Sequence, residues 1–212
     1  MKQSFVVISL LLSYVTTAGA QSIWDRAHLA RVKESLEMPA YAAACQRLLT
    51  DADGYMQQEP LSVMMKDRTA VSGDRHDYLS LSRYFWPDTT KADGLPYVSR
   101  DGESNPELEK LDRVRLQKMA TGVTTLSLAW YFSGDERYAA KATEWLRVWF
   151  LDKATRMNPN LNHAQIVPGL YDGKGRCYGV IDGYSFVEML DAVQLLEGSE
   201  AFTRRDAKAL KA

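Results

Sequence analysis

The chain has 212 residues, of which 46% are apolar and 25% are charged, and its formal net charge is −1. This composition supplies enough apolar side chains for the core of one domain. The near-zero charge excludes the global basic field typical of nucleic-acid-binding proteins, so an anionic ligand would need a local cluster of cations.

The first twenty residues have the features of a secretory signal peptide. Lys2 lies in a short amino-terminal region, an apolar run follows from Phe5 to Val15, and Ala18-Gly19-Ala20 forms an A-x-A cleavage site. That run is too short to span a bilayer, and no other stretch approaches the roughly 20 apolar residues that spanning requires. We therefore expect residues 1–20 to be removed, leaving a periplasmic or secreted protein, residues 21–212, with no membrane partner.

Cys45 and Cys177 are the two cysteines of the chain. Export permits a disulfide between them, but two buried free thiols are an equally good interpretation. Their spacing fits no metal-binding motif.

Two pairs of helices are predicted in the first 150 residues. Trp24 to Glu37 and Pro39 to Met56 form the first pair. A longer helix is expected from Pro106, capped by Asn105, to about Phe132. The Ser-Gly-Asp sequence at 133–135 then ends this helix and caps the next, so residues 106–150 are predicted to form an antiparallel αα-hairpin.

Two further helices are expected near the end of the sequence. Tyr184 to Leu196 carries an apolar face, and Thr203 with Asp206 resembles a capping box that opens another helix. No run shows the alternation of a β-strand, so the predicted class is all-α, built from αα-hairpins of a solenoid or an α/α toroid. Because the last helix reaches Ala212 without a cap, we expect an incomplete toroid; a naturally short bundle is the alternative.

Two long irregular segments interrupt this helical pattern. The connection from Leu151 to Asp182 is far longer than the usual 2–8 residues between packed helices, and it holds too many apolar residues for a disordered linker. The segment 60–105 is rich in arginine and aromatic residues. Such side chains suit an anionic sugar, because guanidinium groups bind carboxylates and aromatic rings stack on sugar faces. The same residue types also fill ordinary loops and interfaces.

Three phrases of the sequence resemble a known family. SGDRHDYLSLSRYFWPDTTKADGLPYVSRDGESNPE, LAWYFSGDERYAAKATEWLRVWFLD and RMNPNLNHAQIVPG occur in the order found in the N-terminal half of the alginate lyase family, which are secreted polysaccharide lyases with an α/α-toroid fold. The resemblance covers essentially all of residues 21–212. It implies β-elimination on a uronate polymer, in which the sugar carboxylate is neutralised, a base removes the C5 proton and an acid protonates O4. No metal ion or other cofactor is implied.

The resemblance also indicates which residues are expected to catalyse the reaction and which to bind the substrate. The family's Asn-Asn-His element is absent, so the catalytic groups are expected beyond Ala212, and the best candidates within the chain are Asn162, His163 and Tyr84. By this resemblance the segment from Lys66 to Arg100 corresponds to a loop that closes over the sugar, and the polar stretch 156–176 to one wall of the cleft. The residues expected to bind substrate are His76, Tyr78, Arg83, Tyr84, Asn160, Asn162, His163 and Gln165. For His163, a hydrogen-bonded loop histidine without a ligand role is the alternative.

The predicted function is therefore a polysaccharide lyase that acts on alginate or a related polyuronate by metal-independent β-elimination. A non-catalytic sugar-binding remnant is one alternative. A glycoside hydrolase of α/α-toroid fold is another, but it would need two carboxylates that flank the bond, and no such pair is evident in the loops.

Overall fold

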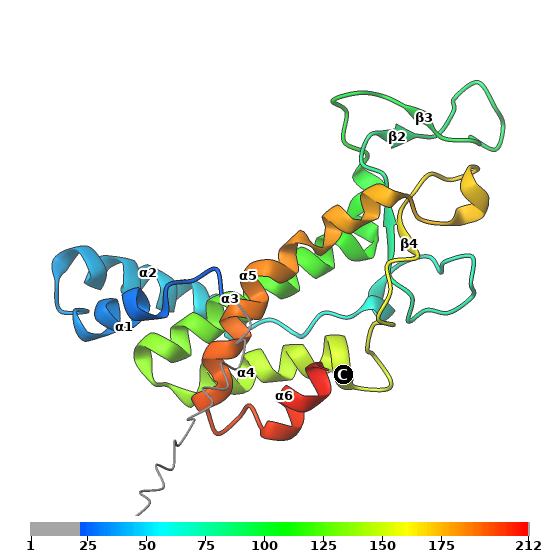
Figure 1. Cartoon of the computed structure of the whole chain (residues 1–212). Helices are drawn as coiled ribbons and strands as arrows, with labels where there is room; N and C mark the ends of the chain where they lie inside the picture. Colours follow the sequence, from blue (N-terminus) through cyan, green and yellow to red (C-terminus); the bar gives the residue numbers. More distant parts are fainter. Residues whose placement is uncertain (1–21, 212) are drawn as a thin grey trace, which may run out of the picture.

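The computed structural model describes residues 22–211, so the predicted signal peptide lies outside the described residues. Helices make up most of this part of the chain, which confirms the predicted class (Figure 1). Within residues 22–211, no helix combines the length and the apolar character needed to cross a membrane. The α-helices are α1 (Arg26–Glu34), α2 (Pro39–Met56), α3 (Asp112–Ser133), α4 (Glu136–Leu146), α5 (Ser185–Leu195) and α6 (Arg204–Leu210).

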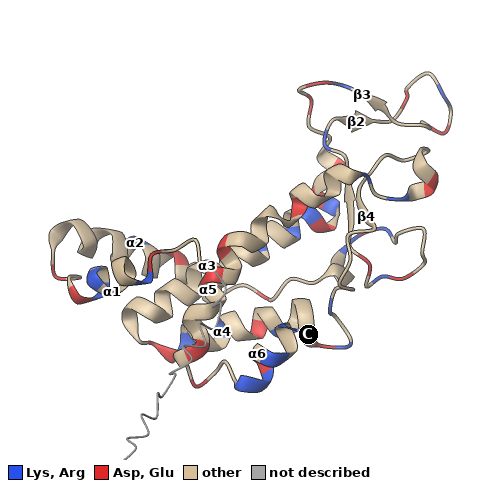
Figure 2. Cartoon of the chain, in the orientation of Figure 1, with Lys and Arg blue, Asp and Glu red and all other residues tan. Residues whose placement is uncertain are grey.

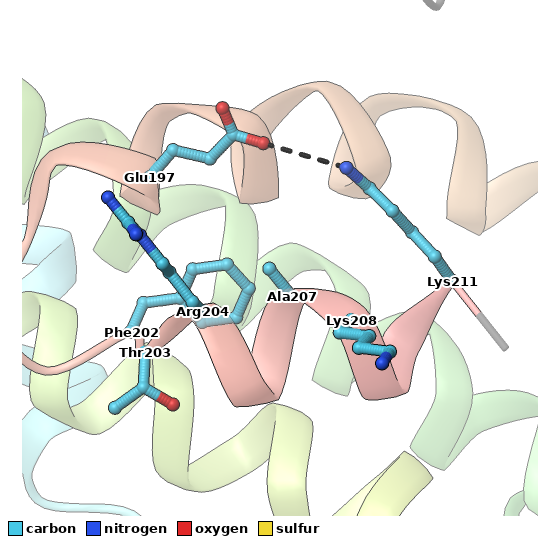
Figure 3. Close-up of a pocket in the computed structure, with 7 residues that line it drawn as sticks. All are labelled: Glu197, Phe202, Thr203, Arg204, Ala207, Lys208 and Lys211. Carbon is cyan, nitrogen blue, oxygen red and sulfur yellow. Dashed lines mark ion pairs between the residues drawn. The ribbon is translucent and has the colours of Figure 1, made fainter.

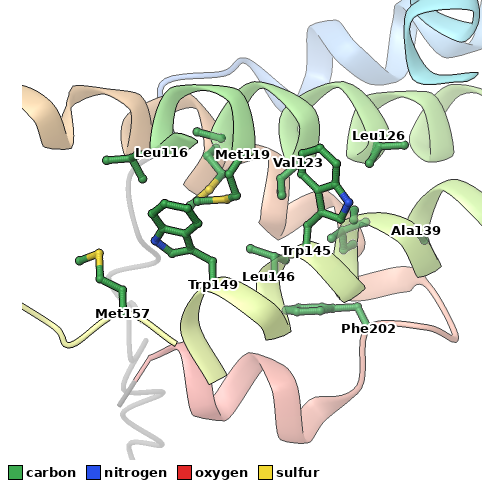
Figure 4. Packing of buried hydrophobic residues seen from close by; sticks show 14 of the residues in the cluster. Leu116, Met119, Val123, Leu126, Ala139, Trp145, Leu146, Trp149, Met157 and Phe202 are labelled. Carbon is green, nitrogen blue, oxygen red and sulfur yellow. The ribbon is translucent and has the colours of Figure 1, made fainter. Parts of the chain in front are cut away.

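Helix α3 is the centre of the helical layer and packs against α2, α4 and α5. It ends at Gly134, whose left-handed φ of 74° allows the reversal into α4, and the side chain of Asp135 accepts a hydrogen bond from the backbone N–H of Arg137. The predicted αα-hairpin is thus confirmed. Its interface is largely apolar, with Trp145 of α4 and Trp149 of the following π-helical turn, Arg147–Leu151, buried in the core beside α3 (Figure 4).

The start of the α3 region differs from the prediction. Pro106–Lys110 forms a 3₁₀ turn capped by Asn105, and Leu111 then adopts an extended conformation before α3 begins at Asp112. The break allows Leu111 to enter a second, smaller apolar cluster while Asp112 turns inward. The helix therefore begins six residues after Pro106, because tertiary anchoring overrides the local start signal.

The expectation of no strands was wrong. The strands β1 (Leu79–Leu81) and β4 (His163–Ile166) pair in parallel, while β2 (Phe85–Trp86) and β3 (Val98–Ser99) pair antiparallel. Each strand has at most four residues, too few to produce a readable alternation. The pairing of β1 with β4 joins the two irregular segments of the sequence, and both sheets lie at the same end of the molecule (Figure 1).

The last two helices agree with the sequence prediction to within a residue or two, and the capping box of Thr203 and Asp206 is present. Leu190 of α5 is 56% exposed although it is apolar, because within the described residues no element covers it. The two cysteines are both free, Cys45 half-buried and Cys177 exposed, so neither interpretation of them holds in this structure.

The carboxylate of Asp206 ties α6 to the α4 region. It accepts hydrogen bonds from Nε and Nη2 of Arg147, at 2.9 and 2.7 Å, and from the N–H and hydroxyl of Thr203. The Arg147 hydrogen bonds, with those of Thr203, hold the pKa of Asp206 well below its usual value. Since the folded pKa is depressed, this stabilisation is present above the unfolded pKa of about 4 and is lost as the pH falls below it.

We therefore expect α6 to detach in acid before the rest of the fold. The protection factors of the α6 amides, each taken relative to the intrinsic exchange rate at the same pH, should be high near neutral pH and lower at about pH 3, and Asp206→Asn should lower them at both. Protection factors in α6 that do not change with pH would contradict the assignment.

Candidate functional site

A pocket with a volume of about 350 Å³ opens where the two irregular segments meet. We call it the arginine groove. Its wall contains no acidic residue, and its principal side chains are those of Arg83, Tyr84, Arg113, Gln165, Arg176 and Tyr178. Residues from β1 to β2, from α3, from β4 and from the loop after β4 thus converge on one site.

Close backbone packing places the loop after β4. A Cβ atom on Gly175 would lie 2.6 Å from the carbonyl oxygen of Ala164, and one on Gly179 would lie 2.6 Å from the Ala164 side chain. Both distances are shorter than real Cβ contacts, so only glycine lets the loop lie against β4. Arg176 and Tyr178, which lie between these glycines in the sequence, are thereby brought to the groove.

The three arginines of the groove keep most of their hydrogen-bonding capacity. Arg176 lies 5.2 Å from the ring centre of Phe85 and 4.7 Å from that of Tyr178, and its Nη1 donates to the hydroxyl of Ser82 at 3.2 Å. Arg83 is exposed, and its side chain makes no hydrogen bond or ion pair within residues 22–211. By contrast, Arg75 and Arg115 each donate to two backbone carbonyls.

Arg113, the third of these arginines, lies above a buried carboxylate. Its Nε is 3.5 Å from Oδ1 of Asp182, a distance that makes an ion pair rather than a hydrogen bond. Asp182 also accepts hydrogen bonds from the hydroxyls of Tyr78, at 3.0 Å, and Ser80, at 2.5 Å, and from Nε2 of Gln165, at 2.9 Å. Burial, together with the Asp182 carboxylate, raises the pKa of Tyr78 far above its usual value.

The backbone of Gln165 is strained. Its φ is 51°, a left-handed value that non-glycine residues rarely adopt. The strain accompanies a one-residue irregularity in the β1–β4 pairing. Leu79 pairs with His163 and Leu81 with Ile166, so β4 has one more residue than β1 between these two pairs. The N–H of Gln165 donates to Ser80 Oγ at 2.7 Å, and its carbonyl accepts from Ser82 Oγ at 2.7 Å. Such strain costs about 1–3 kcal/mol and occurs preferentially at functional sites.

A second polar cluster lies around Asp77, apart from the groove. The carboxylate accepts hydrogen bonds from Asn158 and Asn160, at 2.8 and 3.3 Å, and lies 3.6 Å from Nε2 of His163. Burial opposes ionisation of Asp77, but the hydrogen bonds from Asn158, Ser72 and Asn160 together hold its pKa below the usual value. This cluster joins the two irregular segments and fixes the loop before β4.

The predicted binding residues therefore separate into distinct places. Arg83, Tyr84 and Gln165 line the groove. Three others lie in or beside the Asp77 cluster: His163 is 7% exposed with Nδ1 3.2 Å from the carbonyl of Gly173, His76 contacts the carbonyl of Arg156, and Asn160 donates to Asp77.

The remaining two predicted residues lie neither in the groove wall nor in the Asp77 cluster. Asn162 is exposed and lines none of the described pockets, whereas Tyr78 is fully buried and contacts the groove only through Asp182.

Four residues of the site were missed from the sequence. Arg176 lies beside the aromatic ring of Tyr178. Arginine near aromatic residues is the same signal that drew attention to the segment 60–105. Arg113 was hidden inside a helix, and Asp182 was taken only as the end of a loop. Neither has a local sequence signal, because their roles depend on contacts with residues 17 to 104 positions away.

A larger pocket of about 670 Å³ lies beside α6 (Figure 3). It is open to solvent, an ion pair between Glu197 and Lys211 crosses it, and its one aromatic residue, Phe202, is 5% exposed. Basic residues gather on α6, whereas acidic and basic residues are interspersed over the other elements in this view (Figure 2). The arginine groove is the better candidate, because its cations converge and its aromatic rings face the pocket. Among the described residues, no group of three His, Cys, Asp or Glu could hold a metal ion.

Comparisons with known proteins identify the family of the chain. The family model for alginate lyase matches residues 62–212. The crystal structure of an alginate lyase from Bacteroides ovatus superposes with a TM-score of 0.84 at 55% sequence identity, covering 86% of this chain and 48% of that one. The chain thus spans about half the length of this relative, and a search of curated proteins finds no match. The family match and the structural likeness together show that the chain belongs to the alginate lyase family.

Proposed function

We propose that this chain binds alginate or a related polyuronate in the arginine groove, as part of a polysaccharide lyase that cleaves by metal-independent β-elimination. Membership of the family and the Bacteroides ovatus structure support the class of reaction. The predicted signal peptide supports a periplasmic or secreted location, where such polymers are met.

The observation that carries the proposal is the composition of the groove. Three guanidinium groups converge with two tyrosines, and no carboxylate lies in the wall; Asp182, beneath it, pairs with Arg113 alone of the three. Guanidinium groups bind carboxylates through paired hydrogen bonds, and tyrosine rings pack on the apolar faces of sugars. A polymer that carries one carboxylate on each sugar ring matches both features.

The reaction requires that the sugar carboxylate be neutralised, because the C5 proton is otherwise too weakly acidic for a side-chain base. An arginine of the groove supplies this electrostatic stabilisation, and partial burial strengthens it. Of the three catalytic candidates within the chain, Tyr84 lines the groove, whereas His163 is buried in the Asp77 cluster and Asn162 lies outside. Tyr84 is therefore the in-chain group best placed to reach a bound sugar.

A hydrolase is less compatible with this site. Hydrolysis of a glycosidic bond by the common mechanisms needs two carboxyl groups on either side of the bond. None lines the groove, and the nearest, Asp182, is buried under four donor groups.

A chimera tests the reaction directly. It joins residues 21–212 to the part of the Bacteroides ovatus enzyme that this chain does not cover, and the intact relative serves as the positive control. We expect incubation with alginate to produce an unsaturated sugar that absorbs in the near ultraviolet, at a rate unchanged by a chelator. Activity that is lost on chelation and restored by a divalent ion would refute the metal-free reaction. New reducing ends without the unsaturated product would indicate hydrolysis. An inactive but folded chimera that still binds alginate would favour the sugar-binding remnant.

A further inference from the structure

Asp182 is a buried carboxylate with an unusual set of partners. It lies in the 3₁₀ segment Cys177–Tyr184 just before α5, and its side chain is fully shielded from solvent. Two of its partners, Tyr78 and Ser80, are themselves completely buried, and the other two, Arg113 and Gln165, line the groove. The carboxylate thus connects the interior of the protein with two groove side chains.

The contacts of Asp182 determine which atoms these two side chains present. Arg113 faces Asp182 through Nε, and its two terminal nitrogens make no hydrogen bond within residues 22–211. Gln165 donates from Nε2 to Asp182, which leaves Oε1 and one N–H without a protein partner in the described residues. A guanidinium that turns Nε toward its ion-pair partner keeps the terminal edge, which can form two parallel bonds to a carboxylate. A glutamine held by its amide nitrogen keeps an acceptor for a sugar hydroxyl.

We propose that Asp182 is a positioning residue, which holds Arg113 and Gln165 as one preorganised pair that recognises the carboxylate and a neighbouring hydroxyl of a single uronate unit. The inference rests on the proposed function, because it assumes that the groove binds a uronate polymer. The strained backbone of Gln165 supports it, since both its main-chain groups and its amide are fixed by the same buried network.

Positioning and simple electrostatics predict opposite effects of removing the charge. By Coulomb's law, a negative group beneath the groove repels an anionic sugar, so its loss alone would strengthen binding. If Asp182 orients Arg113 and Gln165, its loss frees both side chains, and the entropy of fixing them again weakens binding.

The test uses the 212-residue chain and a mannuronate tetrasaccharide as the probe, with binding measured by calorimetry. We expect Asp182→Asn to weaken binding by about tenfold or more, whereas a neutral mannose tetrasaccharide binds poorly to both proteins. The matched control is Asp191→Asn, since Asp191 is also buried but accepts hydrogen bonds from the N–H groups of Ile23 and Trp24. This control should lower the melting temperature without changing the affinity.

Each outcome decides between the two proposals. Failure of the wild-type chain to bind the tetrasaccharide would overturn the binding role of the groove itself. Wild-type binding with unchanged or tighter binding by a folded Asp182→Asn variant would overturn the positioning role and leave the groove intact. Equal losses of affinity in Asp182→Asn and Asp191→Asn would likewise show that Asp182 has only a structural role.

A measurement on the wild-type protein remains decisive if Asp182→Asn does not fold. The Nε–H resonance of Arg113, assigned by its loss in Arg113→Lys, should be observable and slow to exchange before ligand is added, and it should shift with the tetrasaccharide. A rapidly exchanging signal would show that Arg113 is not held and would refute the proposal.

Discussion

Replacement of Lys66 by methionine is expected to lower the free energy of unfolding by about 3–5 kcal/mol, the usual result of removing one partner from a buried ion pair. Nζ of Lys66 lies 3.1 Å from Oδ2 of Asp112, and both side chains are fully buried. The amine also donates to the carbonyls of Val63 and Arg75, at 2.6 and 2.7 Å. Loss of the amine leaves two carbonyls and a buried carboxylate without this donor. Urea unfolding curves of the two proteins should therefore show the lower free energy of unfolding of Lys66→Met.

The pH dependence gives this prediction a second signature. Burial raises the pKa of Asp112 to about 6, although Lys66 opposes the shift. Because the folded pKa lies above the unfolded value of about 4, the carboxyl group favours folding at low pH, and that contribution is lost as the pH rises through the folded pKa. The Lys66→Met variant should therefore be more stable near pH 4 than near pH 8.

A surface pair provides the control. Arg137 pairs with Asp135 but is 77% exposed, so Arg137→Met should change stability by less than about 1 kcal/mol. A similarly small change for Lys66→Met, or a stability that increases with pH in that variant, would contradict the role given to the buried pair.

Loss of Arg113 and Arg176 together is expected to weaken the binding of a mannuronate tetrasaccharide by roughly 100-fold or more. Each truncation removes hydrogen bonds to a charged group, worth about 1.5–3 kcal/mol. The two guanidinium groups line the same groove but share no hydrogen-bond or ion-pair partner, so their effects should be close to additive. Calorimetry of Arg113→Ala, Arg176→Ala and the double variant measures each contribution, and the dependence on salt should decrease with each arginine removed.

Arg204→Ala is the matched control, because Arg204 lines the larger pocket beside α6 (Figure 3). It should leave the affinity unchanged. A loss of binding in Arg204→Ala, with normal binding by the double groove variant, would move the site to α6.

Helical elements were predictable because their signals are local. The Ser-Gly-Asp break before α4 and the capping box of α6 each depend on a few adjacent residues, and the structure has both. Leu111 shows the limit of such signals. It continues the apolar stripe of α3 in the sequence, yet it is extended and buried in the second cluster, because Asp112 must reach Lys66 and the N–H of Leu79.

The site was only partly predictable for a related reason. Residue type and segment length drew attention to the two loops, and Arg83, Tyr84 and Gln165 line one groove in the structure. The sequence could not separate these residues from His163, which faces Asp77, because that division arises from the pairing of β1 with β4, 82 or more positions apart. Tyr78 looks like its neighbours in sequence, but it lies immediately before β1, and its side chain, like that of Ser80 two residues later, reaches inward to Asp182.

The central claim is that the arginine groove binds a uronate chain, and side-chain NMR of the 212-residue protein during titration with a mannuronate tetrasaccharide tests it most directly. We predict that the perturbed resonances belong to Arg83, Arg113, Gln165, Arg176 and Tyr178, and that added salt reverses the changes. Perturbations confined to α6, or no perturbation at concentrations at which the Bacteroides ovatus enzyme is saturated, would contradict the claim.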